Sequence, residues 1–116
     1  MSEDEKKQDE TLFLQLVLMF QTAAMQQMGK LLNPLAKKIE KDLNQVKFSI
    51  DILGMIQQKT KGNLTEEEEK FLEHVLFELR MNYLDEVKAD QKRKEEEKTE
   101  SEAKKESQEE KGDKEN

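Results

Sequence analysis

The stretch KTKGNLTEEEEKFLEHVLFELRMNYL, residues 59–84, decides the fold because it holds a helix end and a helix start close together. Gly62 is suited to the left-handed conformation that commonly follows the last turn of a helix. Thr65 is suited to cap the next helix, and Glu68 stands three residues later, which is the spacing of a capping box. The stretch therefore predicts a helical hairpin with its turn at 62–65.

The residues after Thr65 carry apolar side chains at spacings of three and four, which is typical of an amphipathic helix. This pattern fades after Val87. The main seam of the expected helix contains Phe71, Leu72, Val75, Leu76, Leu79 and Tyr83. A second apolar stripe on the same helix contains Phe77, Met81 and Leu84. One seam per helix is enough to pack an isolated three-helix unit, so the second stripe needs a partner.

The other helix of the hairpin is expected to run from about Pro34 or Lys37 to Thr60. Asn33 is a suitable N-cap, and proline fits the first position of a helix. The main seam contains Leu35, Ile39, Leu43, Val46, Ile50 and Leu53, and a second stripe contains Phe48, Ile52 and Met55. Gly54 weakens this helix relative to alanine, and a close helix crossing would explain a glycine at that position.

A first helix is expected from Thr11 to Met28, with Thr11 as its N-cap and Gly29 just after its end. No charged residue occurs in 11–29. Because this helix is apolar almost all round, we expect it to be buried on several sides. A membrane span is not expected, since the dense apolar run 12–20 gives about 14 Å of helix against a hydrocarbon core of about 30 Å.

The 116 residues carry a net charge of −7, and 41% of them are charged, which is too polar for one uniform globule. Nearly all apolar residues lie in 11–87, which we interpret as a helical core domain. Residues 1–10 form an acidic leader that is expected to be disordered. Residues 88–116 hold 9 basic and 11 acidic side chains and no apolar stripe. We expect this low-complexity tail to be disordered beyond its first turns, the alternative being a solvated extension of the preceding helix.

The sequence lacks the residues that most catalytic and metal sites require. It has no cysteine and a single histidine, His74, and its four glycines are too isolated to form a phosphate-binding loop. We therefore expect no catalytic, cofactor-binding or metal-binding residues, and we do not expect an enzyme. The acidic balance argues against a nucleic-acid partner. The absence of cysteine and of a secretory signal at the N-terminus favours the cytoplasm.

Several pieces of the chain together resemble a known family. These pieces are FLQLVLMF at 13–20, NP at 33–34, FSIDILGMI at 48–56, KTKGNLTEEEEKFL at 59–72 and LFELRMNYLDE at 76–86. They resemble the bacterial domain-of-unknown-function family 1844, and the likeness covers about Leu12 to Glu86. The resemblance implies a small, helical, cytoplasmic bacterial protein, and it implies no activity, because the family has none assigned. Within the shared pieces, Asp51 and Arg80 are candidates for an ion pair across the hairpin.

The expected fold class is all-α, with a three-helix core at 11–87, a C-terminal helical hairpin and charged disordered tails. The helix boundaries depend on Gly29, Asn33, Pro34, Gly62, Thr65 and Glu68. The candidate interface residues are those of the two second stripes, Phe48, Ile52, Met55, Phe77, Met81 and Leu84. The expected function is a non-catalytic helical interaction module that forms a homo-oligomer and binds another protein. The alternative is a peripheral membrane-associated factor that uses the apolar first helix.

Overall fold

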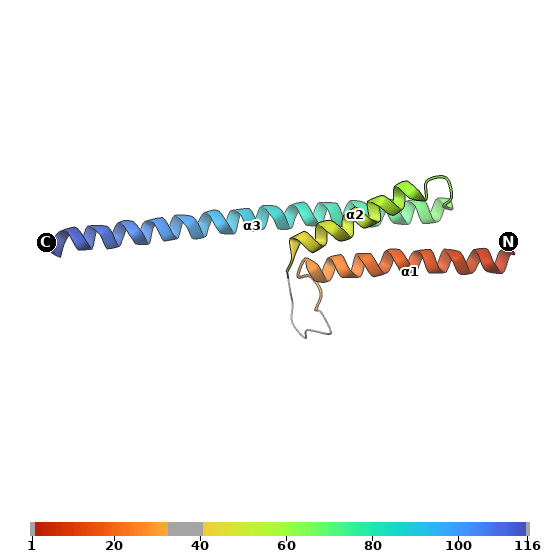
Figure 1. Ribbon diagram of the computed structural model, residues 1–116, viewed down its shortest axis with the longest axis horizontal. Coiled ribbons are helices and arrows are strands. Elements are labelled where there is room, and N and C mark those ends of the chain that lie inside the picture. The colour runs from red at the N-terminus through yellow and green to blue at the C-terminus, as the bar shows by residue number, and fades with distance from the viewer. Residues whose placement is uncertain (1, 33–40, 116) are drawn as a thin grey trace. The chain divides into compact units, whose positions relative to one another are not determined.

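The computed structural model of the protein describes residues 2–32 and 41–115, with side chains up to residue 106. Within these ranges the chain forms three helices, α1 (Glu3–Gln27), α2 (Leu43–Lys59) and α3 (Glu66–Glu115). The expected all-α fold class is confirmed. The chain divides into two compact units, Met1–Leu84 and Asp85–Asn116, so that α3 belongs partly to each. In the first unit, α1, α2 and the beginning of α3 lie side by side (Figure 1).

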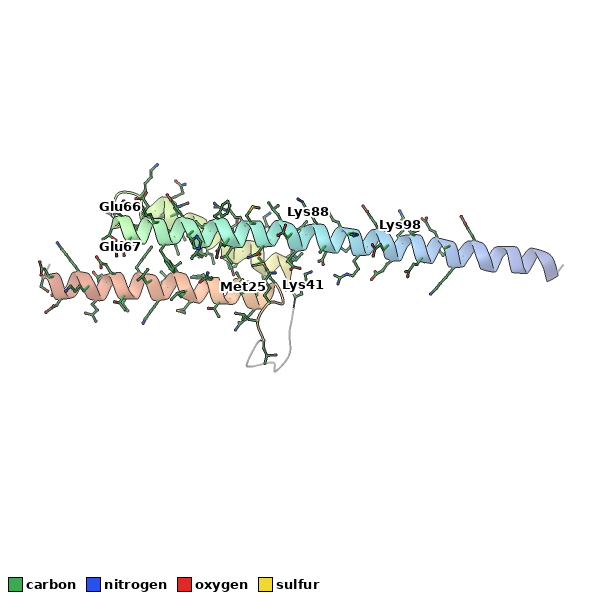
Figure 2. The ribbon with its side chains drawn as sticks, turned by 180° about the vertical axis from the view of Figure 1, so that it is seen from behind. Met25, Lys41, Glu66, Glu67, Lys88 and Lys98 are labelled. Atoms are coloured by element: carbon green, nitrogen blue, oxygen red, sulfur yellow. The ribbon has the colours of Figure 1, made fainter. Side chains whose placement is uncertain are left out.

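The helical hairpin is present at the expected position. Gly62 has a φ of 86°, in the left-handed region that favours glycine. The capping box before α3 is formed in both directions: the Thr65 N–H donates to Glu68 Oε1 at 2.8 Å, and the Glu68 N–H donates to Thr65 Oγ1 at 3.2 Å. Two backbone donors at the start of α3 are therefore satisfied by side chains. Glu66 and Glu67, in the first turn, are labelled in Figure 2.

The core of the first unit is formed by one apolar seam from each helix. Its buried residues are Val17, Ala24, Met28, Val46, Ile50, Leu53, Leu72, Val75, Leu76 and Leu79. The described members of both predicted main seams are buried or packed against this core. A side-chain hydrogen bond joins α1 to α2 beside this core: the buried Ser49 hydroxyl donates to Gln27 Oε1 at 3.0 Å. Among the described side chains, no buried nitrogen or oxygen lacks a hydrogen-bond partner.

The first helix begins eight residues earlier than Thr11, so the predicted N-cap is wrong. Ser2 caps α1 instead, and its Oγ accepts from the Glu5 N–H at 3.2 Å. The acidic first turn, which starts at Glu3, also favours the positive end of the helix dipole. The Thr11 hydroxyl donates back to the Lys7 carbonyl at 3.1 Å, as in a helix interior.

The end of α1 is as expected, but the start of α2 is not. Gly29 has a φ of 80°, and its N–H donates to the Gln26 carbonyl at 3.0 Å. Lys41 pairs with Met28 in an antiparallel bridge, and the extended Asp42 caps α2 by accepting from the Gln45 N–H at 3.2 Å. The prediction of a helix that runs from 34 or 37 through Lys41 and Asp42 is therefore wrong. The bridge to α1 keeps these two residues out of the helix, and α2 begins at Leu43. Asn33 and Pro34, the predicted cap residues, lie outside the described residues.

Figure 2 shows Met25 and Lys41 together at the point where α1 ends and α2 begins. The Asp42 N–H strengthens this junction by donating to the Gln27 carbonyl at 2.7 Å. The end of α1 and the start of α2 are therefore joined by backbone contacts as well as by the Ser49 hydrogen bond.

The second unit contains the charged part of α3, which continues to Glu115. This continuation matches the alternative reading of the tail as an extended helix. Every residue from Gln91 to Glu106 is exposed, so packing contributes nothing to the order of that segment. Disorder of 1–10 and 88–116 in solution stays a prediction, and residues 1 and 116 lie outside the described part.

Candidate interaction surface

Large apolar side chains remain exposed on all three helices and in the segment after α1. Those in the described residues are Leu12, Leu16, Leu18, Met19, Leu31, Leu32, Phe48, Met55, Phe77, Met81 and Leu84. All three helices contribute to this set. Single exposed apolar residues are ordinary on protein surfaces, but apolar stripes repeated at helical spacing are typical of interaction surfaces.

Five of the six predicted interface residues are exposed. On α2, Phe48 is 61% exposed and Met55 is 48% exposed, while Ile52 is half-buried. On α3, Phe77 is the most exposed of the predicted set at 65%, and the later members of its stripe are Met81 and Leu84. The core does not use these side chains, so they are available for binding, and their role as an interface stays a prediction.

The two predicted stripes lie on different sides of the core. The side of α2 that carries Gly54 faces α3, because a Cβ atom on Gly54 would lie 3.3 Å from Arg80 Nη2. The side that carries Ser49 faces α1. At about 100° per residue, Ile52 lies on the Ser49 side of α2, whereas Phe77 lies on the Arg80 side of α3. Both stripes therefore face solvent, the α2 stripe next to the side of α2 that faces α1 and the α3 stripe next to the side of α3 that faces α2.

A third stripe, on α1, was missed by the sequence reasoning. Its residues are Leu12, Leu16 and Met19, which are 55%, 38% and 68% exposed. The expectation that α1 is buried on several sides is wrong within one copy of the chain. The face of α1 that carries Val17 and Ala24 is buried, and the opposite face is exposed. The spacing of these three residues, by four and then by three positions, is the signal in the sequence from which this stripe could have been predicted.

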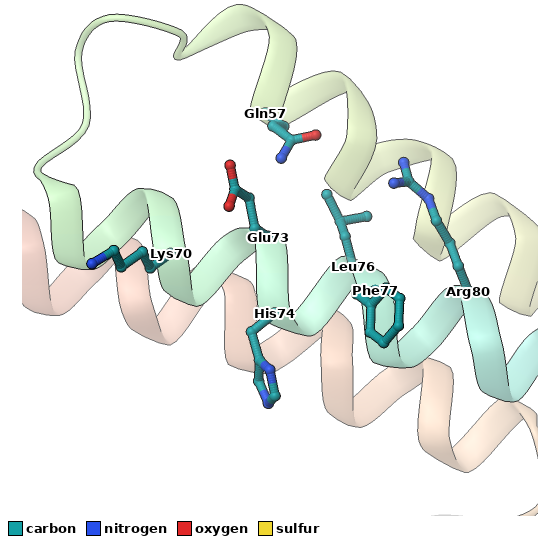
Figure 3. Close-up of a pocket in the computed structure, with 7 residues that line it drawn as sticks. All are labelled: Gln57, Lys70, Glu73, His74, Leu76, Phe77 and Arg80. Atoms are coloured by element: carbon teal, nitrogen blue, oxygen red, sulfur yellow. The ribbon is translucent and has the colours of Figure 1, made fainter.

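A shallow depression of about 540 Å³ lies where α2 and α3 meet solvent. Its walls include Gln57 from α2 and Glu73, Phe77 and Arg80 from α3 (Figure 3). The Arg80 side chain extends from α3 toward α2, and Glu73 points to the same side. The predicted pairing of Asp51 with Arg80 is absent, since no ion pair or hydrogen bond holds the Arg80 guanidinium within the described structure.

Lys70 and His74, which also line this depression, have partners along α3 itself. Lys70 Nζ lies 3.0 Å from Glu66 Oε1, and His74 Nε2 lies 3.1 Å from Glu78 Oε1. Both contacts are exposed and each spans one helical turn, and the Lys70–Glu66 ion pair contributes only about 0.2–0.5 kcal/mol to stability. His74 therefore sits in an ordinary surface pair on the solvent side of α3.

The described residues contain no group of three or more histidine, aspartate or glutamate side chains arranged to hold a metal ion. None of their helices combines the length and the hydropathy that crossing a bilayer requires.

The fold and its surface define a small all-α protein with a three-helix core and unpaired apolar stripes. Residues 10–85 match the family described as Domain of unknown function (DUF1844), and the chain belongs to this family. The match nearly coincides with the region of resemblance in the sequence, and it covers all of α2, most of α1 and the beginning of α3. No curated protein and no solved structure matched the chain.

Proposed function

We propose that this protein is a non-catalytic interaction module that self-associates and binds a further protein through its apolar stripes. The observation that carries the proposal is the set of exposed side chains at helical spacing on α1, α2 and α3. Covering several such side chains stabilises an assembly, because each buried Leu, Met or Phe contributes about 1.5–3 kcal/mol. A symmetric homo-oligomer is the commonest way for a soluble protein to cover such stripes.

A stripe that stays exposed after self-association is suited to a second kind of partner. The repeat of Leu12, Leu16 and Met19 matches the spacing at which two amphipathic helices pack together. The expected partner is therefore an amphipathic helix of another protein. The proposal includes a cytoplasmic location, which is supported by the absence of cysteine from the sequence.

Sedimentation equilibrium of the full chain over a dilution series tests the self-association. A dimer or larger species that persists on dilution supports the proposal. A folded monomer at every concentration overturns it, and the apolar stripes then require a different partner. Circular dichroism on the same samples establishes that the chain is folded.

A second candidate function, peripheral attachment to a membrane, is favoured by the exposed apolar face of α1. Flotation with phosphatidylcholine vesicles tests it. Attachment through α1 predicts that Met19→Glu abolishes flotation, because Met19 is 68% exposed. Gln8→Glu is the matched control, since it adds the same charge to an exposed polar position of α1 that precedes the apolar run 12–20. Failure of the unaltered chain to float would rule this candidate out.

A further inference from the structure

The solvent-facing side of α3 carries a seam of its own. The seam contains Lys70, His74, Phe77, Met81 and Leu84, at alternating spacings of four and three. This is the spacing at which two helices pack along a common seam. Phe77 is its central residue and is 65% exposed. The seam therefore has an aromatic centre, apolar residues on one side and Lys70 with His74 on the other.

Two opposite charges flank Phe77 on one edge of this seam. Glu73 lies four residues before Phe77 and Arg80 three residues after it, so the two charges are two helical turns apart on the same side. Figure 3 shows both side chains pointing toward α2, with Phe77 between them along α3. Both are exposed, and neither has an ion pair or a hydrogen bond through its side chain within the described residues.

We propose that this seam binds the same seam of a second copy, antiparallel, about a two-fold axis at Phe77. The proposal rests on the self-association proposed above and gives it a location. Under this symmetry, Glu73 of each copy lies opposite Arg80 of the other, which forms two identical ion pairs. Phe77 packs on Phe77 of the second copy, Met81 on His74, and Leu84 on the aliphatic stem of Lys70.

The charges select this arrangement over the other pairings of the same seam. A parallel pair would turn the Glu73 edge of one seam toward the opposite edge of the other, which places Glu73 beside Glu78 of the second copy. An antiparallel pair centred on Met81 would bring the two Arg80 side chains together. Like charges across an interface are strongly unfavourable, so both alternatives are penalised. The axis at Phe77 places Glu73 of each copy beside Arg80 of the other, and the two Glu78 side chains that it brings near each other are each paired with His74 of their own copy.

The experiment exchanges the two charges and follows the dimer dissociation constant by sedimentation equilibrium of the full chain. Glu73→Arg alone and Arg80→Glu alone each create two repulsive contacts, so each is expected to weaken dimerisation at least about tenfold. An equimolar mixture of the two variants restores dimerisation, because its heterodimer has only opposite-charge contacts. The double variant, with both exchanges in one chain, also restores it.

Two control variants change the net charge equally in the second unit. Glu95→Arg matches Glu73→Arg, and Lys98→Glu matches Arg80→Glu, and neither is expected to alter the dissociation constant. Circular dichroism establishes that all variants keep the fold, which is expected because Glu73 and Arg80 are exposed.

The outcomes separate this inference from the proposed function. An unaltered chain that is monomeric at every concentration overturns both. A dimer whose dissociation constant is unchanged in both single variants overturns only the interface at Phe77 and leaves self-association standing. Weakening by the single variants without recovery in the mixture also overturns the two-fold arrangement.

Discussion

Arg80 Nη2 lies 3.3 Å from the position that a Cβ atom would occupy on Gly54, so the guanidinium of α3 rests directly against the backbone of α2. The expectation of a close helix crossing at Gly54 is wrong, because the neighbour of this glycine within the described residues is the end of a charged side chain and not the backbone of a second helix. Because the contact involves the flexible end of an exposed arginine, a small side chain at position 54 displaces only the guanidinium.

Gly54→Ala is therefore expected to stabilise the fold by about 0.5–1 kcal/mol, the gain in helix propensity of alanine over glycine. Gly62→Ala is the matched control. A Cβ on Gly62 would meet nothing within 4 Å, but its φ of 86° is unfavourable for any other residue, and a loss of about 1–2 kcal/mol is expected. Urea unfolding of both variants measures the two effects. A loss of stability in Gly54→Ala would show that Arg80 cannot move aside.

The capping box gives a second prediction. Thr65→Ala removes the oxygen that accepts from the Glu68 N–H, and a loss of about 1 kcal/mol in the free energy of unfolding is expected. Thr65→Ser keeps that oxygen and is expected to keep most of the stability. Thermal or urea unfolding followed by circular dichroism measures both variants. Equal losses in the two variants would contradict the role of the hydroxyl.

The division of α2 into a buried seam and an exposed stripe gives a third prediction. Leu53 is fully buried, so Leu53→Ala is expected to cost about 2–5 kcal/mol of stability. Met55 is 48% exposed, and Met55→Ala is expected to change the stability of the monomer by less than about 0.5 kcal/mol. Unfolding at high dilution, where assembly does not contribute, makes the comparison. A large loss in Met55→Ala would mean that the α2 stripe is part of the intramolecular core.

The fourth prediction concerns the boundary between the core and the charged tail. A chain that ends at Asp90 is expected to keep the stability of the full chain within about 0.5 kcal/mol, because every residue from Gln91 to Glu106 is exposed. In the full chain, amide hydrogen exchange is expected to be fast in that segment and slow around Leu76. Slow exchange between Gln91 and Glu106 would instead show a stable extended helix and refute the predicted disorder.

Local signals in the sequence were sufficient for the hairpin and for the end of α1. Gly29 and Gly62 have the positive φ values expected of them, and Thr65 and Glu68 form the expected capping box. These features depend on interactions within three or four residues, so no knowledge of the remaining chain is needed. The main seams of α2 and α3 were also predictable, because helical periodicity sorts side chains between two faces.

The helix starts were less predictable, because several residues compete to cap. Thr11 and Ser2 are both suitable N-caps, and the helix-forming residues between them allow α1 to begin at the earlier one. Asp42 was overlooked as a cap inside an apparently continuous pattern. Its position is set by the bridge between Lys41 and Met28, which is a contact between distant parts of the chain.

Only the tertiary structure decided which apolar stripe of each helix is covered. Val17 and Leu16 are neighbours on α1 with similar side chains, yet Val17 is fully buried and Leu16 is 38% exposed. Periodicity states which residues share a face, but the rotation of a helix about its axis is set by simultaneous packing against the other two. That packing leaves one apolar stripe on each helix largely exposed, and it places Arg80 against Gly54 without an ion pair to Asp51.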